Sequence, residues 1–380
     1  MATCGHPVTQ PILSIIVPTY RRPVELHFQL ASILCQLDDV PIGSVEVIVV
    51  DNGLDEMTPR VMHDLQRNGS ALKYVQRDSS VALEISIMSA REHGTGQYLW
   101  TLPDDDAIHP GCVKAILQHI QSESPEIFLI SIEAWDPDLA NCIGIGHSFL
   151  KERATPFPSL HEAVRVLGWG VYFAYIGAAV FRADPFRSAD ISPYAGSAHI
   201  YSFALLEAFW NKPCEFVRFP AIKYRVDRAL PWSGDKLHGV TTAFAECFQA
   251  AIGRGLGDWK TFLGFRECIA TDHKLLYLKV HSLAACMLSN IFDRLKTDSR
   301  TKITETEWRL FEVAYAGYGN GEMLRALALM RSGQVNLLEY DVTINRALAA
   351  ILIRENQSKL EYPPDFALKA SPIGVTENST

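Results

Sequence analysis

The sequence predicts an α/β protein: a mainly parallel sheet with flanking helices over residues 1–235, then a mostly α-helical domain over 236–380 that ends in a mobile tail. Three observations lead to this prediction. Short apolar runs alternate with helical spacings in the first part, which is typical of βαβ units. These runs are continuously apolar, as in strands that are buried on both faces. Beyond about residue 235 almost every pattern has the helical period.

The first third of the chain holds five strand candidates separated by helical segments. The strands are expected at 13–17, 45–50, 72–76, 97–102 and 127–132. The helices between them are expected at 23–37, 58–66, 81–91 and 112–121. Parallel strands are joined by crossovers, so the carboxyl ends of the first four strands should meet at one edge of the sheet, where ligands bind in open α/β folds.

Weaker patterns follow. The Gly- and Pro-rich stretch 135–158 is expected to be a loop, with strands at 172–181 and 215–224 and a helix at 198–210 between them. In the last third the expected helices are 240–252, 262–290, 305–316, 321–331 and 340–355. The tail 362–380 contains Pro, Gly, Ser and Thr, and we expect it to be mobile.

Composition excludes several classes of protein. With 35 basic and 43 acidic residues the net charge is −8, so no nucleic-acid partner is expected. The longest apolar stretch, 171–181, is far shorter than the roughly 20 residues of a transmembrane helix. The N-terminus lacks the pattern of a secretory signal, and the eight cysteines are scattered without a CxxC pair, which predicts a cytoplasmic protein without disulfides or zinc.

Three adjacent aspartates, Asp104, Asp105 and Asp106, follow the fourth strand candidate. Neighbouring carboxylates raise one another's pKa unless a cation lies among them. Oxygen ligands suit a hard divalent ion, so the triplet predicts a site for Mn²⁺ or Mg²⁺. The alternative is a solvated acidic turn in which one aspartate caps the next helix.

Polar residues also follow the first two strands. Thr19, Tyr20 and Arg21 come after the first, and Asp51 and Asn52 after the second. An aspartate can accept a hydrogen bond from a base, and a tyrosine can stack on it. Each residue alone fits an ordinary turn or a solvated side chain better than a binding site. Together with the triplet, they predict a site for a nucleotide diphosphate and a metal.

These segments resemble a known family. SIIVPTYRR (14–22), VIVVDNG (47–53) and GQYLWTLPDDDAIHPG (96–111) are similar to the motifs of family 2 glycosyltransferases, inverting enzymes of the Rossmann-like GT-A fold that use nucleotide sugars. The resemblance covers about residues 12–232. Segments 170–181 and 194–199 resemble bacterial surface-polysaccharide transferases of the abequosyltransferase type. A hexosyl- or deoxyhexosyltransferase is therefore implied.

The resemblance also implies roles for single residues. It places Asp105 on the metal-ligand position and Asp104 on a nucleotide-contacting one, whereas simple alternation would pair Asp104 with Asp106 as ligands, so all three stay candidates. The nucleotide-sugar pocket is expected to contain Pro18, Thr19, Tyr20, Arg21, Asp51, Asn52, Arg77, Asp104, Arg225 and Trp232. Arg225 and Trp232 lie in a basic segment after the last strand that could close over a diphosphate.

The catalytic base is less clear from the sequence. The acidic pair that carries this base in relatives is missing, and His199 stands at about that place. Histidine has an ordinary pKa of about 6.5, which suits a general base. A metal or phosphate contact and a structural role at the helix start are the alternatives, and Asp190 is the substitute base.

The leading hypothesis is thus a metal-dependent inverting glycosyltransferase with a glycan, lipid-linked, peptide or small-molecule acceptor. A nucleotidyltransferase and a catalytically inactive sugar-binding or scaffolding relative are the alternatives. The helical domain has three candidate roles: it binds the acceptor, forms a homo-oligomer interface, or makes a peripheral membrane contact.

Overall fold

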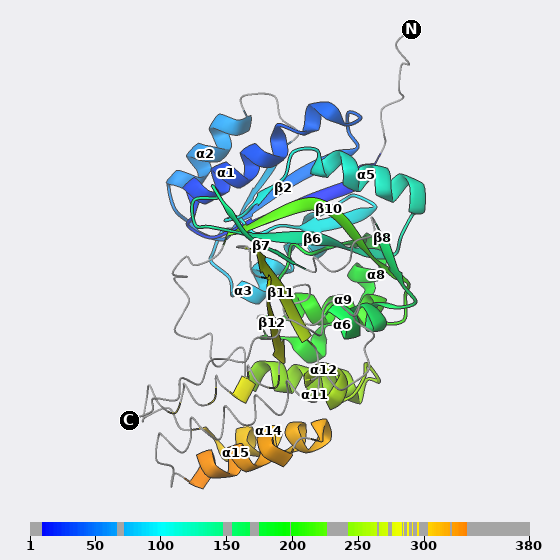
Figure 1. Cartoon of the computed structure of the whole chain (residues 1–380). Helices are drawn as coiled ribbons and strands as arrows, with labels where there is room; N and C mark the ends of the chain where they lie inside the picture. Colours follow the sequence, from blue (N-terminus) through cyan, green and yellow to red (C-terminus); the bar gives the residue numbers. More distant parts are fainter. Residues whose placement is uncertain are drawn as a thin grey trace, which may run out of the picture.

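The computed structural model describes residues 10–66, 72–146, 154–167, 175–197, 199–225, 242–263, 266–272, 276–282, 303–319 and 321–332, with five single residues between 284 and 295. A mixed sheet with helices on both faces is followed by further helical layers (Figure 1). The expected helix 340–355 and the tail lie outside the described residues.

The parallel half of the sheet is built from the first four strands, in the order β3-β2-β1-β4. They are β1 (Leu13–Thr19), β2 (Val45–Asp51), β3 (Leu72–Gln76) and β4 (Tyr98–Thr101). Every residue of β2 is buried, which explains the apolar run over residues 47–50. Thr19 pairs with Asp51 at the carboxyl ends of β1 and β2. The predicted strands and their common edge are confirmed.

Crossover helices connect these strands. They are α1 (Pro23–Leu34), α2 (Met57–Gln66), α3 (Leu83–Ile87), α4 (Ser89–His93) and α5 (Cys112–Glu123), with the 3₁₀ turn η1 (Leu37–Asp39) after α1. A proline begins α1, where its missing N–H has no partner to lose. The helices α1, α2 and α5 lie on one face of the sheet and α3 on the other (Figure 1).

The second half of the sheet is mostly antiparallel. Its strands are β5 (Ala107–Ile108), β6 (Ile127–Trp135), β7 (Cys142–Gly146), β8 (Ala154–Phe157), β9 (Ala179–Arg182) and β10 (Cys214–Arg225). Strand β9 lies between β4 and β6, and β10 runs parallel to β6 and antiparallel to β5 and β8. Two predictions are wrong here. The stretch 135–158 contains β7 and β8, and the strand expected from residue 172 begins at Ala179, after a turn at 176–177.

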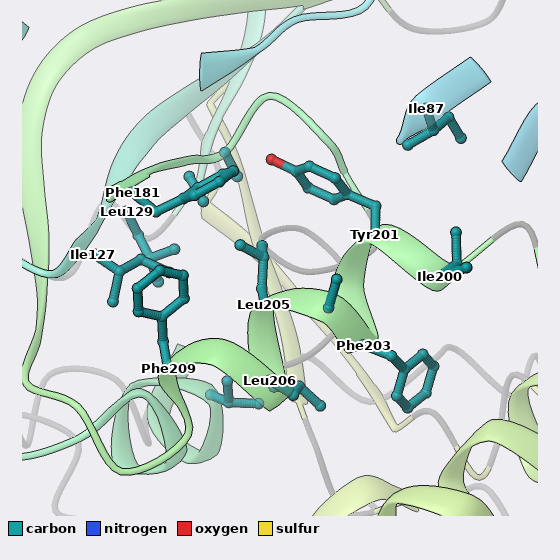
Figure 2. Packing of buried hydrophobic residues seen from close by; sticks show 14 of the residues in the cluster. Ile87, Ile127, Leu129, Phe181, Ile200, Tyr201, Phe203, Leu205, Leu206 and Phe209 are labelled. Carbon is teal, nitrogen blue, oxygen red and sulfur yellow. The ribbon is translucent and has the colours of Figure 1, made fainter. Parts of the chain in front are cut away.

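The mostly apolar helix α9 (Ile200–Phe209), buried everywhere except at Glu207 and Ala208, lies between the sheet and the C-terminal helices. Figure 2 shows Tyr201, Leu205 and Phe209 of α9 directed toward Phe181 of β9 and Ile127 of β6. Its neighbours on this face are α6 (Leu160–Leu167), α8 (Ala183–Ser188) and the 3₁₀ turn η2 (Ser192–Tyr194). A helix that is buried on nearly every side needs neighbours on nearly every side, and the next layer completes that cover.

The region after residue 235 is mainly helical. Its helices are α11 (Phe244–Gly253), α12 (Trp259–Leu263), α14 (Glu305–Tyr318) and α15 (Gly321–Ser332). The predicted helix 262–290 is wrong, because β11 (Arg266–Asp272) and β12 (Leu276–Ser282) form an antiparallel pair there. Strand β11 also pairs with β7, so the sheet crosses the predicted boundary at 235. No helix among the described residues is long and apolar enough to cross a membrane.

Candidate active site

The carboxyl ends of β1 and β4 are joined through a buried carboxylate. The hydroxyl of Thr19 donates to Asp104 Oδ2 at 2.7 Å, and the Tyr20 amide approaches the same oxygen at 3.4 Å. Thr19 and Asp104 are buried, whereas Tyr20 is 46% exposed and has the Arg21 guanidinium 5.2 Å from the centre of its ring. The predicted nucleotide residues of β1 therefore surround the acidic turn, with one aromatic ring accessible for stacking. Pro18 lies one residue earlier, within β1.

The loop after β2 lies against the loop after β1. The amide of Asn52 donates to the Thr19 carbonyl at 2.9 Å, and Arg21 Nε donates to the Gly53 carbonyl at 2.9 Å. A Cβ on Gly53 would lie 2.7 Å from the Arg21 backbone nitrogen, so only glycine allows this approach. Arg21 itself has φ 54°, which is uncommon for a residue other than glycine. The two predicted loops thus form one packed rim.

The side chains of Asp51 and Asn52 are held by hydrogen bonds, mainly to β3 and to the segment that precedes α3. Asp51 accepts from the Tyr74 hydroxyl at 2.7 Å and from the Gly53 amide at 2.7 Å. Asn52 exchanges two hydrogen bonds with the backbone of Val81, at 2.7 and 2.8 Å. These contacts hold both side chains rigidly, as a base and ribose pocket requires.

Arg77 follows β3 at the same edge of the sheet. Its backbone amide donates to the Asp51 carbonyl at 3.0 Å. Arg77 therefore lies beside Asp51, one of the residues that are predicted to contact the nucleotide. Its guanidinium lies 3.2 Å from Glu92 and 3.3 Å from the Ser89 hydroxyl. Arg77 therefore stays a candidate contact that a ligand would have to share with Glu92.

Two members of the acidic triplet are deeply buried, and burial raises the pKa of each. The pKa of Asp104 rises to about 6 and that of Asp106 to about 7, because both are desolvated and both face the charge of Asp105. Hydrogen bonds from Thr19 to Asp104, and from Arg225 to Asp106, oppose the rise. The turn therefore holds more negative charge than its surroundings stabilise.

Arg22 partly compensates this charge. Its Nη1 lies 2.6 Å from Asp105 Oδ2 and 3.2 Å from Asp104 Oδ1, so one nitrogen bridges two carboxylates. Burial lowers the pKa of Arg22, but the two aspartates outweigh it and the net shift is upward. The sequence analysis assigned no role to Arg22, and the structure makes it the counter-ion of the turn.

Arg225 connects the end of β10 to the same turn. Its amide donates to Asp106 Oδ1 at 2.8 Å, its Nε to the Asp105 carbonyl at 2.7 Å and its Nη1 to the Pro137 carbonyl at 2.6 Å. The Tyr175 hydroxyl donates to the other oxygen of Asp106 at 2.5 Å. Arg225 thus reaches the acidic turn, where a closing segment was expected. Trp232 lies outside the described residues.

A divalent cation fits this turn in one way. No set of three His, Cys, Asp or Glu side chains within the described ranges converges as a metal site. Asp104 and Asp106 are held by internal donors, and Asp105 is the most exposed of the three, at 23%. Mg²⁺ commonly binds to one or two carboxylates and completes its shell with water and substrate phosphates. The oxygen donors of the turn suit that mode, with Asp105 as the accessible ligand.

His199 lies at the start of α9, as the sequence predicts. Its ring stacks on Phe244 of α11, with ring centroids 3.7 Å apart, and its amide donates to the Ser197 hydroxyl at 3.1 Å. Burial lowers the pKa of His199 to about 4, below the ordinary value of about 6.5. None of these contacts joins it to the acidic turn. The substitute base Asp190 pairs with Arg254 at 3.1 Å.

Three site residues had no assigned role in the sequence: Arg22, Tyr175 and Phe244. Arg22 stands inside the PTYRR motif, so its place after a strand was a usable signal. Tyr175 and Phe244 come from distant parts of the chain and carry no local signal of a site. Only the fold brings them to Asp106 and His199.

Comparison with known proteins agrees with this geometry. Residues 14–189, from β1 to the end of α8, match the family model "Glycosyl transferase family 2". This part of the chain is therefore similar to family 2 glycosyltransferases. The match includes all strand-end loops described above and ends before His199 and Arg225.

A curated relative of this domain is GalNAc(5)-diNAcBac-PP-undecaprenol beta-1,3-glucosyltransferase from Campylobacter jejuni subsp. jejuni serotype O:2. It is 26% identical over 119 residues, which are 31% of this chain and 37% of the relative. The chain therefore matches little more than a third of that protein's length.

Solved structures show the same fold over most of the chain. Residues 1–349 of S. aureus TarS superpose with a TM-score of 0.53 at 16% identity, over 84% of this chain and 87% of that one. The same TarS fragment in complex with UDP-GlcNAc gives a TM-score of 0.55 at 15% identity, over the same shares. The GT-A-like fold with a helical C-terminal region is confirmed.

Proposed function

We propose that this protein transfers a sugar from a nucleotide-diphosphate sugar to an acceptor hydroxyl, with inversion at the anomeric carbon. The observation that carries the proposal is the continuous rim formed by Thr19, Asp51, Asn52 and Asp104 within a family 2 domain. The rim offers hydrogen-bond acceptors for a base and ribose next to carboxylates that favour a cation. A TarS structure holds UDP-GlcNAc, which makes a UDP-sugar the first donor to test.

The chain's own residues divide the chemistry between two places. Asp51, Asn52 and the exposed ring of Tyr20 would bind and orient the nucleoside. Asp105, with Asp104 behind it, would hold Mn²⁺ or Mg²⁺ against the diphosphate. When bound, such an ion stabilises the charge that develops on the leaving diphosphate.

His199 is the proposed general base. A ring nitrogen would take the proton of the acceptor hydroxyl while that oxygen bonds to the anomeric carbon and the nucleoside diphosphate leaves with the electron pair of the broken bond. A pKa of about 4 keeps the ring neutral, and so able to accept, at every pH above about 5. The same low pKa makes His199 a weak base, which places its contribution at the lower end of the usual range.

The acceptor class is proposed from the relative. The Campylobacter protein is named for a polyprenyl diphosphate-linked glycan, so a lipid-linked glycan is the first acceptor to test. Such an acceptor would be met at a membrane surface, which a peripheral contact would allow. Glycan, peptide and small-molecule acceptors are the other arms of that test.

Donor binding and donor hydrolysis test the proposal. Thermal shift with UDP-, GDP-, CDP- and dTDP-sugars, each with Mn²⁺, Mg²⁺ or EDTA, should show one nucleotide that stabilises the protein in the presence of the ion. Slow hydrolysis of that donor should need the same ion. If a donor binds but is neither hydrolysed nor transferred, the protein is an inactive sugar-binding relative. If no nucleotide sugar binds with either ion, the proposal is wrong.

A further inference from the structure

Arg22 occupies the place at the acidic turn where a cation would be needed. A single nitrogen, Nη1, lies 2.6 Å from Asp105 Oδ2 and 3.2 Å from Asp104 Oδ1. The Arg22 side chain is 21% exposed, similar to Asp105 at 23%, so the pair lies at the border between the buried turn and solvent. The ion pair therefore uses the oxygen of the triplet that a ligand from solvent could reach most easily.

The backbone that carries Arg22 is fixed, whereas its side chain is partly exposed and has four rotatable bonds. Arg21 holds the left-handed turn against Gly53, and the Arg22 carbonyl accepts from the Leu26 amide in the first turn of α1. A guanidinium on four rotatable bonds can leave Asp105 without disturbing this frame. Its planar fork also suits two oxygens of a diphosphate better than a point charge would.

We propose that Arg22 is the resident counter-ion of Asp105, that it exchanges with the divalent ion, and that it contacts the donor's diphosphate once displaced. This inference rests on the proposed function. A divalent ion bound to Asp105 Oδ2 would compete for that oxygen with the Arg22 nitrogen, which lies 2.6 Å from it. The exchange would keep the turn's charge compensated in both states and would make ion binding and donor binding depend on each other.

The test measures Mn²⁺ binding before any turnover. Mn²⁺ alone is titrated into the wild-type protein, Arg22→Gln and Arg22→Lys, with free Mn²⁺ followed by electron paramagnetic resonance. Arg22→Gln should bind Mn²⁺ at least about tenfold more tightly than wild type, because a competing charge near the surface is gone. Arg22→Lys keeps the positive charge without the planar guanidinium, and its Mn²⁺ affinity should lie between those of wild type and Arg22→Gln. Arg165→Gln, which breaks the exposed pair with Glu162, makes the same charge change elsewhere and should bind like wild type.

UDP is the second probe. At saturating Mn²⁺, Arg22→Gln should bind UDP several-fold more weakly than wild type, because the displaced guanidinium no longer contacts the diphosphate. Equal UDP affinity would overturn the diphosphate contact. Mn²⁺ affinity in Arg22→Gln that is equal to or weaker than wild type, or no Mn²⁺ binding in a folded Arg22→Gln protein, would overturn the exchange.

These results are separable from the proposed function. If wild type transfers sugar with Mn²⁺ while Mn²⁺ affinity is the same in Arg22→Gln, the function stands and the inference about Arg22 fails. If wild type and Arg22→Gln both bind Mn²⁺ as expected but no nucleotide sugar binds either protein, the exchange stands and the donor assignment fails.

Discussion

The acidic turn and the start of α9 show opposite responses to the same physical cause. Desolvation raises the pKa of Asp104 and Asp106 toward 6 and 7, and it lowers the pKa of His199 to about 4. The carboxylates lie among hydrogen-bond donors, while the histidine ring lies flat on Phe244. The turn therefore attracts added positive charge, and the histidine site disfavours it. One region is suited to a cation and the other to a neutral proton acceptor.

Asp105→Asn should produce the largest loss. The charge that would bind the ion is removed, and a metal ion's stabilisation of several kcal/mol in the transition state corresponds to roughly 10³–10⁴-fold in kcat. Steady-state turnover with Mn²⁺ is the measurement, and thermal unfolding checks the fold. Asp38→Asn, an exposed aspartate of η1, makes the same charge change as a control. Metal-dependent turnover at the wild-type rate would show that Asp105 is not the ligand.

His199→Ala should come next, with transfer slowed by roughly 10²–10³-fold and donor affinity almost unchanged, because a general base acts on the acceptor. His161→Ala is a matched control, since that ring also stacks on an aromatic, Trp210, and its pKa is also lowered by burial. Isothermal titration with the donor separates binding from transfer. Lost donor binding would make His199 a ligand of metal or phosphate, and unchanged turnover would leave it structural.

Stability should depend on pH with the sign set by the acidic turn. Asp104 and Asp106 have folded-state pKa values above their ordinary 3.8, so the native state binds more protons than the unfolded chain between about pH 4 and 7. The free energy of unfolding should therefore increase as the pH falls from 8 to 6.5, by at most about 1.4 kcal/mol per pH unit for each group. Urea unfolding at a series of pH values measures this.

The same series tests both halves of the comparison. His199 has a folded pKa below 6.5, so its contribution is complete above pH 6.5 and is lost as the pH falls toward 4. In His199→Phe the free energy of unfolding should therefore increase more steeply as the pH falls below 6.5. Added Mn²⁺ should remove much of the decrease in the free energy of unfolding that occurs as the pH rises above 6.5. If the free energy of unfolding of the wild-type protein rises steadily up to pH 8, the raised pKa values of Asp104 and Asp106 are contradicted.

Phe244→Leu should have the smallest effect. Without the ring, water reaches His199 and its pKa should move from about 4 toward 6.5. The acid limb of the pH–rate profile should shift upward, with kcat reduced a few-fold and the donor KM unchanged. Phe248→Leu is the control, because it removes the same volume from α11 beside Phe262. Equal shifts of the acid limb in both variants would mean that the packing of α11, rather than the stacking of Phe244, determines the pKa of His199.

The parallel half of the fold could be predicted from the sequence because its information is local. β2 is buried along its whole length and reads as one apolar run that ends at Asp51. β1 is buried at every position except Pro18, and its end carries Thr19. The nucleotide candidates follow directly from those ends, so their meeting at one edge was predictable once the strands were.

The rest of the fold and of the site depends on contacts between residues that are distant in the chain. β7 is a Gly-containing strand that forms because β6 and β11 pair with it, and β11 lies in a stretch whose period suggested a helix. The stacking of Phe244 on His199 and the contact of Tyr175 with Asp106 arise in the same way. Tertiary pairing overrides local propensity at such places.

The pairing of β7 with β11 has a consequence for how this chain can be divided. A chain that ended near Ser233 would leave one side of β7 without its partner and α9 without the cover of α11. An open strand edge is a template for joining other molecules, so such a fragment should assemble into multimers even if its nucleotide pocket is complete. An exchange of the C-terminal region between relatives would therefore have to keep β7 with its partner β11, and its boundary would lie within the sheet, ahead of β7.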